Sequence, residues 1–232
     1  MIKSFCDKLK ASIHDVGSVN VVCFGDSVTH GCFGPFRGNL SDDSVFGAYP
    51  AKLHKALETL CPGRVFNVIN SGVAGDTVTR ALLRFERDVL AYHPDLVVVA
   101  FGVNDFGDKA AYLRSLAAVF DALNERKIPC IYMTEHTMNF YRDEGTVKNV
   151  YEYAAVTAKA QTDGTMDTLF AEGKALAKEK GVYVCDVYSR WKALYEAGVD
   201  TTALLANRIN HPVPEMHDLF VWSLIETIFF AG

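Results

Sequence analysis

Short apolar runs alternate along this chain with longer segments in which apolar residues recur with a helical period. The apolar runs are rich in β-branched residues and cover positions 19–24, 65–69, 96–101, 128–133 and 182–187. Several are apolar throughout, which is typical of strands covered on both faces, as in a parallel sheet. The helical period is found at positions 46–60, 77–92, 109–127, 166–180 and 214–229.

This alternation of strand and helix predicts an α/β fold. We expect a three-layer α/β/α sandwich with a central, mostly parallel five-stranded sheet and right-handed crossovers. No repeat, linker or low-complexity tract interrupts the pattern, so a single domain over residues 1–232 is expected. The ligand site of such a fold lies at the carboxyl ends of the strands. The least regular stretch, 137–163, is expected to form a loop or lid over that edge.

Composition and charge narrow the function classes. Half of the 232 residues are hydrophobic, enough for one sizeable core. A net charge of -5 without a run of Lys and Arg argues against a nucleic-acid partner. The apolar stretch at 96–103 is far shorter than the roughly 20 residues of a transmembrane helix, so no membrane span is expected. The amino-terminal segment lacks the apolar region of a signal peptide, which predicts a cytoplasmic protein.

Small and polar residues follow three successive predicted strands. Gly25-Asp26-Ser27 follows the first strand, Asn70 to Thr77 (NSGVAGDT) follows the second, and Gly102-Val103-Asn104-Asp105 follows the third. Gly-Asp-Ser alone is also ordinary turn chemistry between a strand and a helix. The conjunction is more specific, because acyl transfer needs a serine oxygen, a base and several donors around one oxyanion.

These motifs make the chain resemble the SGNH hydrolases, also called the GDSL esterase and lipase family. The match runs from Phe24-Gly25-Asp26-Ser27 to His217, and it implies a flavodoxin-like fold. It also implies that Ser27 is the nucleophile and that its backbone N–H serves the oxyanion hole. The Gly75 backbone N–H and the Asn104 side-chain amide would complete that hole, and a glycine at 75 lets the backbone approach the tetrahedral centre closely.

The general base is expected near the carboxyl end. The family pattern of a histidine, a proline and a second histidine six places after the first is met by His211, Pro212 and His217. The resemblance therefore implies that His211 is the base, whereas we interpret His217 as a packing or hydrogen-bonding residue. Asp26, Asn70 and Asp105 are expected to support the site, with Asn70 organising its loop and Asp105 acting as a structural hydrogen-bonding partner.

The chain departs from the family pattern at the catalytic acid. The family usually has an aspartate three residues before the histidine, but Arg208 stands there. A guanidinium beside His211 would oppose its protonation, so Arg208 is expected to point elsewhere. We hypothesise a Ser27–His211 dyad whose ring is oriented by a neutral group. The candidates left open are Asn207, Asn210 or a backbone carbonyl as that group, and Asp200 or Glu215 as a carboxylate from another direction.

The resulting prediction is a serine esterase that acts on a small-molecule ester without a metal or organic cofactor. We favour short-chain acyl esters, acetyl esters of carbohydrates included. Five residues are candidates for the pocket lining: Phe33, Phe36, Arg37, Tyr141 and Arg142. The alternatives are a lysophospholipase or thioesterase of the same fold, and a ligand-binding module that has lost the catalytic acid. The Gly-x-Ser-x-Gly motif of α/β-hydrolases and the H-E-x-x-H motif of zinc hydrolases are absent from the sequence.

Overall fold

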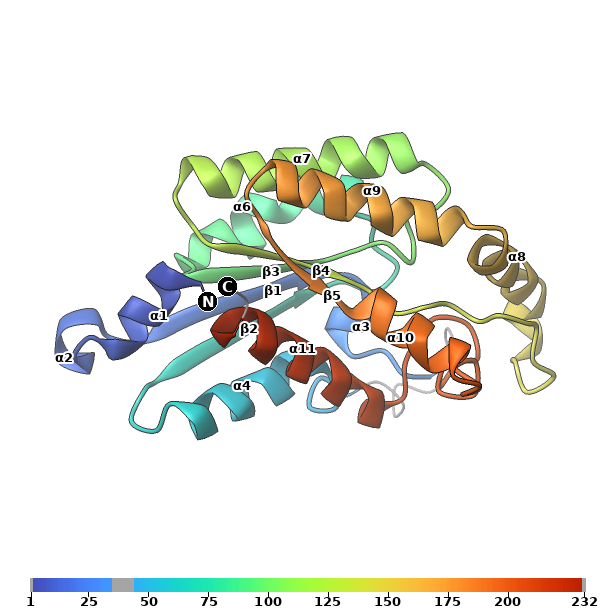
Figure 1. The fold of residues 1–232 in the computed structure, drawn as a ribbon, viewed down its shortest axis with the longest axis horizontal. Helices are drawn as coiled ribbons and strands as arrows, with labels where there is room; N and C mark the ends of the chain where they lie inside the picture. Colours follow the sequence, from blue (N-terminus) through green and yellow to red (C-terminus); the bar gives the residue numbers. More distant parts are fainter. Residues whose placement is uncertain (1, 35–43, 231–232) are drawn as a thin grey trace.

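The protein, seen here as a computed structural model that describes residues 2–34 and 44–230, is built around a five-stranded parallel sheet (Figure 1). The strand order is β2-β1-β3-β4-β5. The strands are β1 (Val19–Gly25), β2 (Phe66–Gly72), β3 (Leu96–Ala100), β4 (Cys130–Thr134) and β5 (Tyr183–Asp186). Since β1 lies between β2 and β3, the strand order reverses beside β1. Such a switch point is where α/β sheets of this kind bind ligands.

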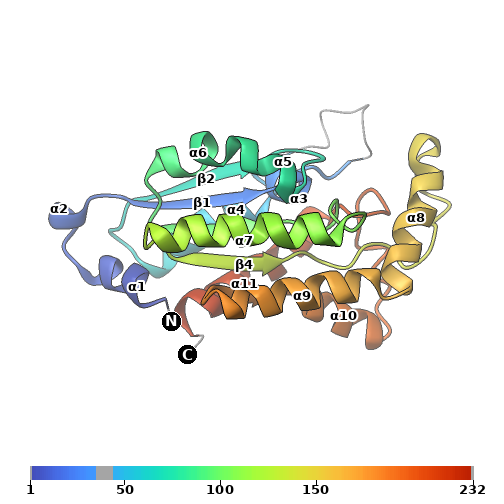
Figure 2. The same cartoon turned by 90° about the horizontal axis from the view of Figure 1, so that it is seen from above.

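Helices cover both faces of the sheet, and the predicted three-layer α/β/α sandwich is confirmed. Figures 1 and 2 show α4 (Tyr49–Leu60) and α11 (His217–Phe229) on one face, and α6 (Phe85–Asp88), α7 (Lys109–Glu125) and α9 (Thr165–Glu179) on the other. The remaining α-helices are α1 (Lys3–Lys10), α2 (Ile13–Val16), α3 (Ser27–His30), α5 (Val78–Ala81), α8 (Tyr151–Thr162) and α10 (Val187–Glu196). The 3-10 turns are η2 (Leu82–Arg84), η3 (Leu90–Tyr92), η4 (Lys148–Val150) and η5 (Pro214–Met216).

Two of the predicted segments differ in kind or continuity from the structure. The helix expected over 77–92 is broken into α5, η2, α6 and η3. Because the helix breaks at η2, the Arg84 side chain bonds carbonyl groups at the ends of β1 and β2. The stretch 137–163, expected to be a loop, contains the twelve-residue helix α8. Its sequence, YEYAAVTAKAQT, includes four alanines, which have the highest helix propensity.

The centre of the sheet is completely buried, which fixes the strand ends that carry the site. Every residue of β3 and β4 is buried, and β1 is buried apart from Asn20. The ring of Phe24, near the end of β1, packs edge-on against Phe101, the residue after β3, with 5.1 Å between the centroids. Close packing of this kind holds the carboxyl edge rigid. At the opposite edge, Ile2 donates a backbone hydrogen bond to Ile228 (3.0 Å).

Candidate active site

Ser27 is the first residue of α3, directly after β1. The Asp26 side chain caps this turn, because its Oδ1 accepts a hydrogen bond from the Val28 backbone N–H (2.9 Å). A glycine on the neighbouring strand allows the close approach of α3. A Cβ atom on Gly72 would lie 2.2 Å from the His30 backbone nitrogen. The chain therefore presents Ser27, which is 1% exposed, at the edge of the sheet.

Asn70 ties α3 to β2. Its Nδ2 donates to the carbonyl oxygens of Thr29 (2.8 Å) and His30 (3.2 Å), and its Oδ1 accepts from the Gly72 N–H (2.9 Å). These three bonds connect the turn after β1 to the end of β2. Asp105 lies in the loop after β3, and its Oδ1 accepts a hydrogen bond from the Val78 N–H at the start of α5 (3.0 Å).

His211 meets Ser27 across the fold. Its Nε2 lies 3.1 Å from the Ser27 Oγ, and the imidazole is buried. The loop that carries it is held by Asn207, whose Oδ1 accepts from the backbone N–H groups of Ile209, Asn210 and His211 at 2.9–3.0 Å. Asn207 thus fixes the loop by way of the backbone. The structure brings together the serine and the histidine that the motifs singled out.

The other ring nitrogen of His211, Nδ1, lies 3.3 Å from the Gly34 carbonyl oxygen. A proton on Nδ1 shared with this carbonyl leaves Nε2 as an acceptor facing the serine hydroxyl. Gly34 therefore supplies a backbone carbonyl of the kind hypothesised as an orienting group. Arg208, in the left-handed region (φ 58°), turns its guanidinium to the Ala203 carbonyl oxygen (2.6 Å).

The two carboxylates considered as the acid lie on exposed segments. Asp200 is bonded by the Tyr141 hydroxyl (2.7 Å) and by the Ala203 N–H (3.2 Å). This bond raises the pKa of Tyr141 to about 12. Glu215 is an exposed residue of η5, before α11.

Asn104 lies in the loop after β3 and contacts Asp26, the residue before Ser27. Its Nδ2 donates to Asp26 Oδ2 (2.8 Å) and to the Asp76 carbonyl oxygen (3.0 Å). Gly75, just before this carbonyl, has φ 71°, in the left-handed region that favours glycine. Gly75 and Asn104 thus lie together at the sheet edge, and both amide hydrogens of Asn104 have protein acceptors.

A cavity of about 330 Å³ opens beside these residues. It is lined by Gly75, Asn104, Val150, Tyr153, Asn207, Ile209 and Asn210. Tyr153 belongs to α8, at the carboxyl edge of the sheet (Figure 2). The segment expected to cover the site therefore contributes a wall of the cavity through a helix.

Three of the residues predicted to line the pocket are described by the structure, and they contact other parts of the molecule. Arg142 lies over the Tyr151 ring, 4.3 Å from its centroid, and Tyr141 is exposed. The Phe33 ring packs edge-on against His217 (5.2 Å). Phe36 and Arg37 lie outside the described residues. Tyr141 and Arg142 are exposed, whereas Val150 and Tyr153, which follow them in sequence, line this cavity.

His217 is a core residue, as interpreted from the sequence. Its Nδ1 accepts from the Tyr49 N–H (3.1 Å), and its ring stacks on Phe220 with 5.2 Å between the centroids. Burial lowers the pKa of His217 to about 3. A neutral, stacked imidazole of this kind serves packing.

A group of buried carboxyls that sequence reasoning missed lies beneath Ser27 and Asn104. Glu135, directly after β4, is 0% exposed and accepts from the Val103 N–H through Oε2 (2.8 Å). Its carboxyl is also within hydrogen-bonding reach of Asp26. Burial raises the pKa of Asp26 to about 7 and that of Asp105 to about 8. Burial, together with the Asp26 charge, raises the pKa of Glu135 well above its usual range. The only signal in the sequence is a glutamate that directly follows an apolar strand.

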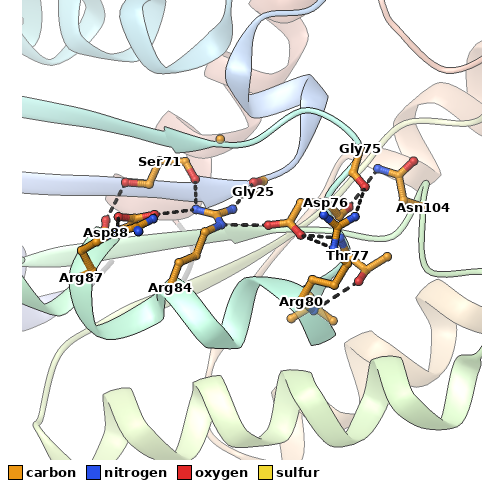
Figure 3. A network of polar contacts seen from close by, with 12 residues as sticks. Gly25, Ser71, Gly75, Asp76, Thr77, Arg80, Arg84, Arg87, Asp88 and Asn104 are labelled. Atoms are coloured by element: carbon orange, nitrogen blue, oxygen red, sulfur yellow. Dashed lines mark hydrogen bonds and ion pairs between the residues drawn. The ribbon is translucent and has the colours of Figure 1, made fainter. Parts of the chain in front are cut away.

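A second polar network lies on the β2 side of the same edge (Figure 3). Arg84 donates to Asp76 Oδ2 (2.8 Å) and to the carbonyl oxygens of Ser71 (2.8 Å) and Gly25 (3.0 Å). It also reaches Asp88 at 3.4 Å. One guanidinium thus joins the ends of β1 and β2 to the loop that contains Gly75.

A parallel α/β sandwich with a serine and a histidine in contact at its carboxyl edge has the architecture of a serine hydrolase. The model of the GDSL-like Lipase/Acylhydrolase family matches residues 23–219, most of the chain. The protein belongs to this family, and the resemblance inferred from the motifs is confirmed.

Individual relatives match smaller parts of the sequence. An acetylxylan esterase of Geobacillus stearothermophilus is 35% identical over 95 residues, which are 39% of this chain and 42% of that protein. The uncharacterized lipoprotein YqeF of Bacillus subtilis (strain 168) is 34% identical over 91 residues, 38% of this chain and 33% of the relative. The chain thus spans less than half the length of these curated relatives. The crystal structure of Axe2, an acetylxylan esterase from Geobacillus stearothermophilus, shares the fold with a TM-score of 0.69 at 21% identity, covering 93% of this chain and 96% of that one.

In residues 2–34 and 44–230, no helix has the length and apolar character required to cross a bilayer. One curated relative is named a lipoprotein, so the cytoplasmic location stays a prediction.

Proposed function

We propose that the protein is a serine esterase that hydrolyses short-chain acyl esters, acetyl esters in particular. The observation that carries this proposal is the 3.1 Å contact between Ser27 Oγ and His211 Nε2 in a chain of an acylhydrolase family. A hydroxyl in contact with an imidazole acceptor is the arrangement that activates a serine nucleophile.

In the proposed mechanism, His211 Nε2 takes the hydroxyl proton as Ser27 Oγ forms a bond to the ester carbonyl carbon. The backbone N–H groups of Ser27 and Gly75 and the Asn104 amide stabilise the oxyanion. For Asn104, the oxyanion would share the hydrogen that otherwise points to the Asp76 carbonyl. His211 then gives its proton to the departing alkoxide, and water repeats the cycle on the acyl-enzyme. In both steps the Gly34 carbonyl holds the imidazole orientation.

The cavity supports a small and partly polar substrate, and acetylated carbohydrate is the class we favour. Its lining contains three asparagine side chains, which can bond sugar hydroxyls, and the Tyr153 ring, on which a sugar face can stack. The relative named acetylxylan esterase agrees with this class. A long acyl chain, as in a lysophospholipase, would have Val150 and Ile209 as its aliphatic contacts in this cavity. We keep a cytoplasmic location and a small-molecule ester as part of the proposal.

The test is hydrolysis of p-nitrophenyl esters from acetate to decanoate, with wild type and Ser27→Ala. We expect the highest kcat/KM on acetate and a loss of about 10³-fold or more in the variant, because the nucleophile is removed. Ser4→Ala, at an exposed position of α1, is the matched control and should retain full activity. A fluorophosphonate probe should label wild type and the control but not Ser27→Ala. If the folded wild type neither hydrolyses these esters nor reacts with the probe, the binding-module alternative replaces the esterase.

A further inference from the structure

We infer that Glu135 is a positioning residue of the active site, which holds Asp26 and, through it, the Asn104 amide by donating a carboxyl proton to Asp26. The inference rests on the proposed function, since it concerns the alignment of an oxyanion donor. Glu135 touches none of the reacting atoms in this proposal, and it acts through Asp26.

The contacts of Asp26 explain why its alignment matters to the site. One of its oxygens, Oδ1, fixes the start of α3 through the Val28 N–H (2.9 Å), and the other, Oδ2, fixes the Asn104 Nδ2 (2.8 Å). A single carboxyl group therefore sets both the turn that presents Ser27 and the amide proposed for the oxyanion. A displacement of Asp26 would move the nucleophile and the donor together.

The same contacts decide which partner carries the proton. Asp26 accepts two N–H donors, which stabilise its anion, whereas Glu135 accepts one, from Val103. The second oxygen of Glu135, Oε1, is buried and accepts no N–H bond from the described part of the chain. A proton on this oxygen gives Asp26 a third donor. The raised pKa of Glu135 supports this assignment.

A shared proton relieves the electrostatic repulsion between the buried carboxyl groups of Asp26 and Glu135. Both carboxyls are 0% exposed, and the other carboxyls that face them are Asp105 after β3 and Asp76 after β2. Across residues 2–34 and 44–230, no lysine or arginine forms an ion pair with Asp26 or Glu135. Two adjacent buried anions without a cation would repel each other, whereas a shared proton makes one strong hydrogen bond.

The experiment compares two replacements of similar size. In Glu135→Gln, the amide can donate to Asp26 and its oxygen can accept from Val103, so we expect kcat within about threefold of wild type. Glu135→Met has a similar volume but can neither donate to Asp26 nor replace the oxygen that accepts from the Val103 N–H. We expect its kcat on p-nitrophenyl acetate to fall about 10–100-fold, with KM within about twofold, because a misplaced oxyanion donor weakens transition-state binding more than substrate binding.

Thermal unfolding of each variant separates this role from a structural one, since kcat is measured well below both transitions. Equal kcat values for Glu135→Met and Glu135→Gln in folded protein would overturn the inference, even where Ser27→Ala confirms the esterase. A second readout tests the position of Asn104 even if the wild type hydrolyses none of the esters. The Asn104 side-chain NH₂ signals in a ¹H–¹⁵N spectrum, assigned with Asn104→Asp, should move in Glu135→Met and stay near their wild-type positions in Glu135→Gln. Unmoved signals in both variants would also overturn it.

Discussion

Two groups of buried carboxyls lie at the same edge of the sheet, and they are neutralised in different ways. On the β2 side, the Asp76 carboxylate faces the Arg84 guanidinium at 2.8 Å (Figure 3). Under Ser27, Asp26 and Glu135 face each other, and within the described ranges neither forms an ion pair with a lysine or arginine. One group is held by a cation, and the other by protons.

The difference follows the task of each group. Arg84 bonds two strand ends and a loop, so its ion pair fastens backbone segments together. A cation beneath Ser27 would instead add a charge next to the oxyanion and the imidazolium that form during catalysis. A protonated carboxyl pair gives directional hydrogen bonds with less net charge. The carboxyls that align the proposed catalytic groups are therefore the ones without a cation.

The largest effect is expected from the variant that removes the Arg84 cation. In Arg84→Met, Asp76 stays buried without its partner, and two carbonyl groups lose a donor. We expect the free energy of unfolding in urea to fall by about 3 kcal/mol or more.

Arg87→Ala is the control for that experiment. Arg87 also pairs with Asp88, but its side chain is 77% exposed, so the ion pair is screened by water. We expect its urea midpoint to match that of wild type. Equal losses in the two variants would mean that the burial of Arg84 has no energetic importance and that the contrast between the groups is wrong.

Asp105→Asn tests whether a buried carboxyl without a cation carries a proton in the folded state. The pKa of Asp105 is raised on folding from its usual 3.8 to about 8 by burial. Between these values the folded state keeps a proton that the unfolded chain releases, so the free energy of unfolding falls as the pH rises through this window. Asparagine can still accept from the Val78 N–H without titrating. Relative to wild type, the variant should gain about 1–3 kcal/mol between pH 4 and pH 8.5.

Asp108→Asn provides the matched control, because Asp108 also accepts a backbone N–H at a helix start, from Ala111, but is exposed. Since asparagine caps a helix about as well as aspartate, this exposed substitution should change the free energy of unfolding at pH 7 by less than about 0.5 kcal/mol. Below about pH 6.5, wild type and Asp105→Asn should both lose stability, because burial lowers the pKa values of His136 and His217 in the folded state. A constant difference between Asp105→Asn and wild type would contradict a protonated Asp105.

The sequence predicted the strands well, because buried parallel strands are apolar runs with sharp ends. The helices were less predictable where tertiary contacts decide them. The segment 77–92 has a continuous helical period, yet it breaks at η2, where Arg84 bonds carbonyl groups at the strand ends. The helix α10 begins directly after β5 with an Asp186 cap, so the apolar Val187 was assigned to the strand.

The site divides in the same way. Ser27, Asn104 and His211 belong to motifs that can be read locally, whereas the carboxyl pair depends on a contact between residues far apart in sequence. Asp26 belongs to the Gly-Asp-Ser motif, but nothing nearby indicates that Glu135 lies against it. Whether two carboxyl groups share a proton depends on their burial and on the number of hydrogen-bond donors around them, and both are properties of the fold.

The smallest effect on kcat is expected from replacing Asp200, an exposed carboxylate that accepts a hydrogen bond from a hydroxyl group. Asp200 accepts from Tyr141 at the surface, and the Gly34 carbonyl already lies at His211 Nδ1. Asp200→Ala should therefore keep kcat on p-nitrophenyl acetate within about tenfold, with Glu215→Ala as a parallel case. Losing a true catalytic aspartate reduces turnover about 10⁴-fold in serine proteases. A loss of that size in folded Asp200→Ala would assign the acid to Asp200, and a charged carboxylate would then serve the site after all.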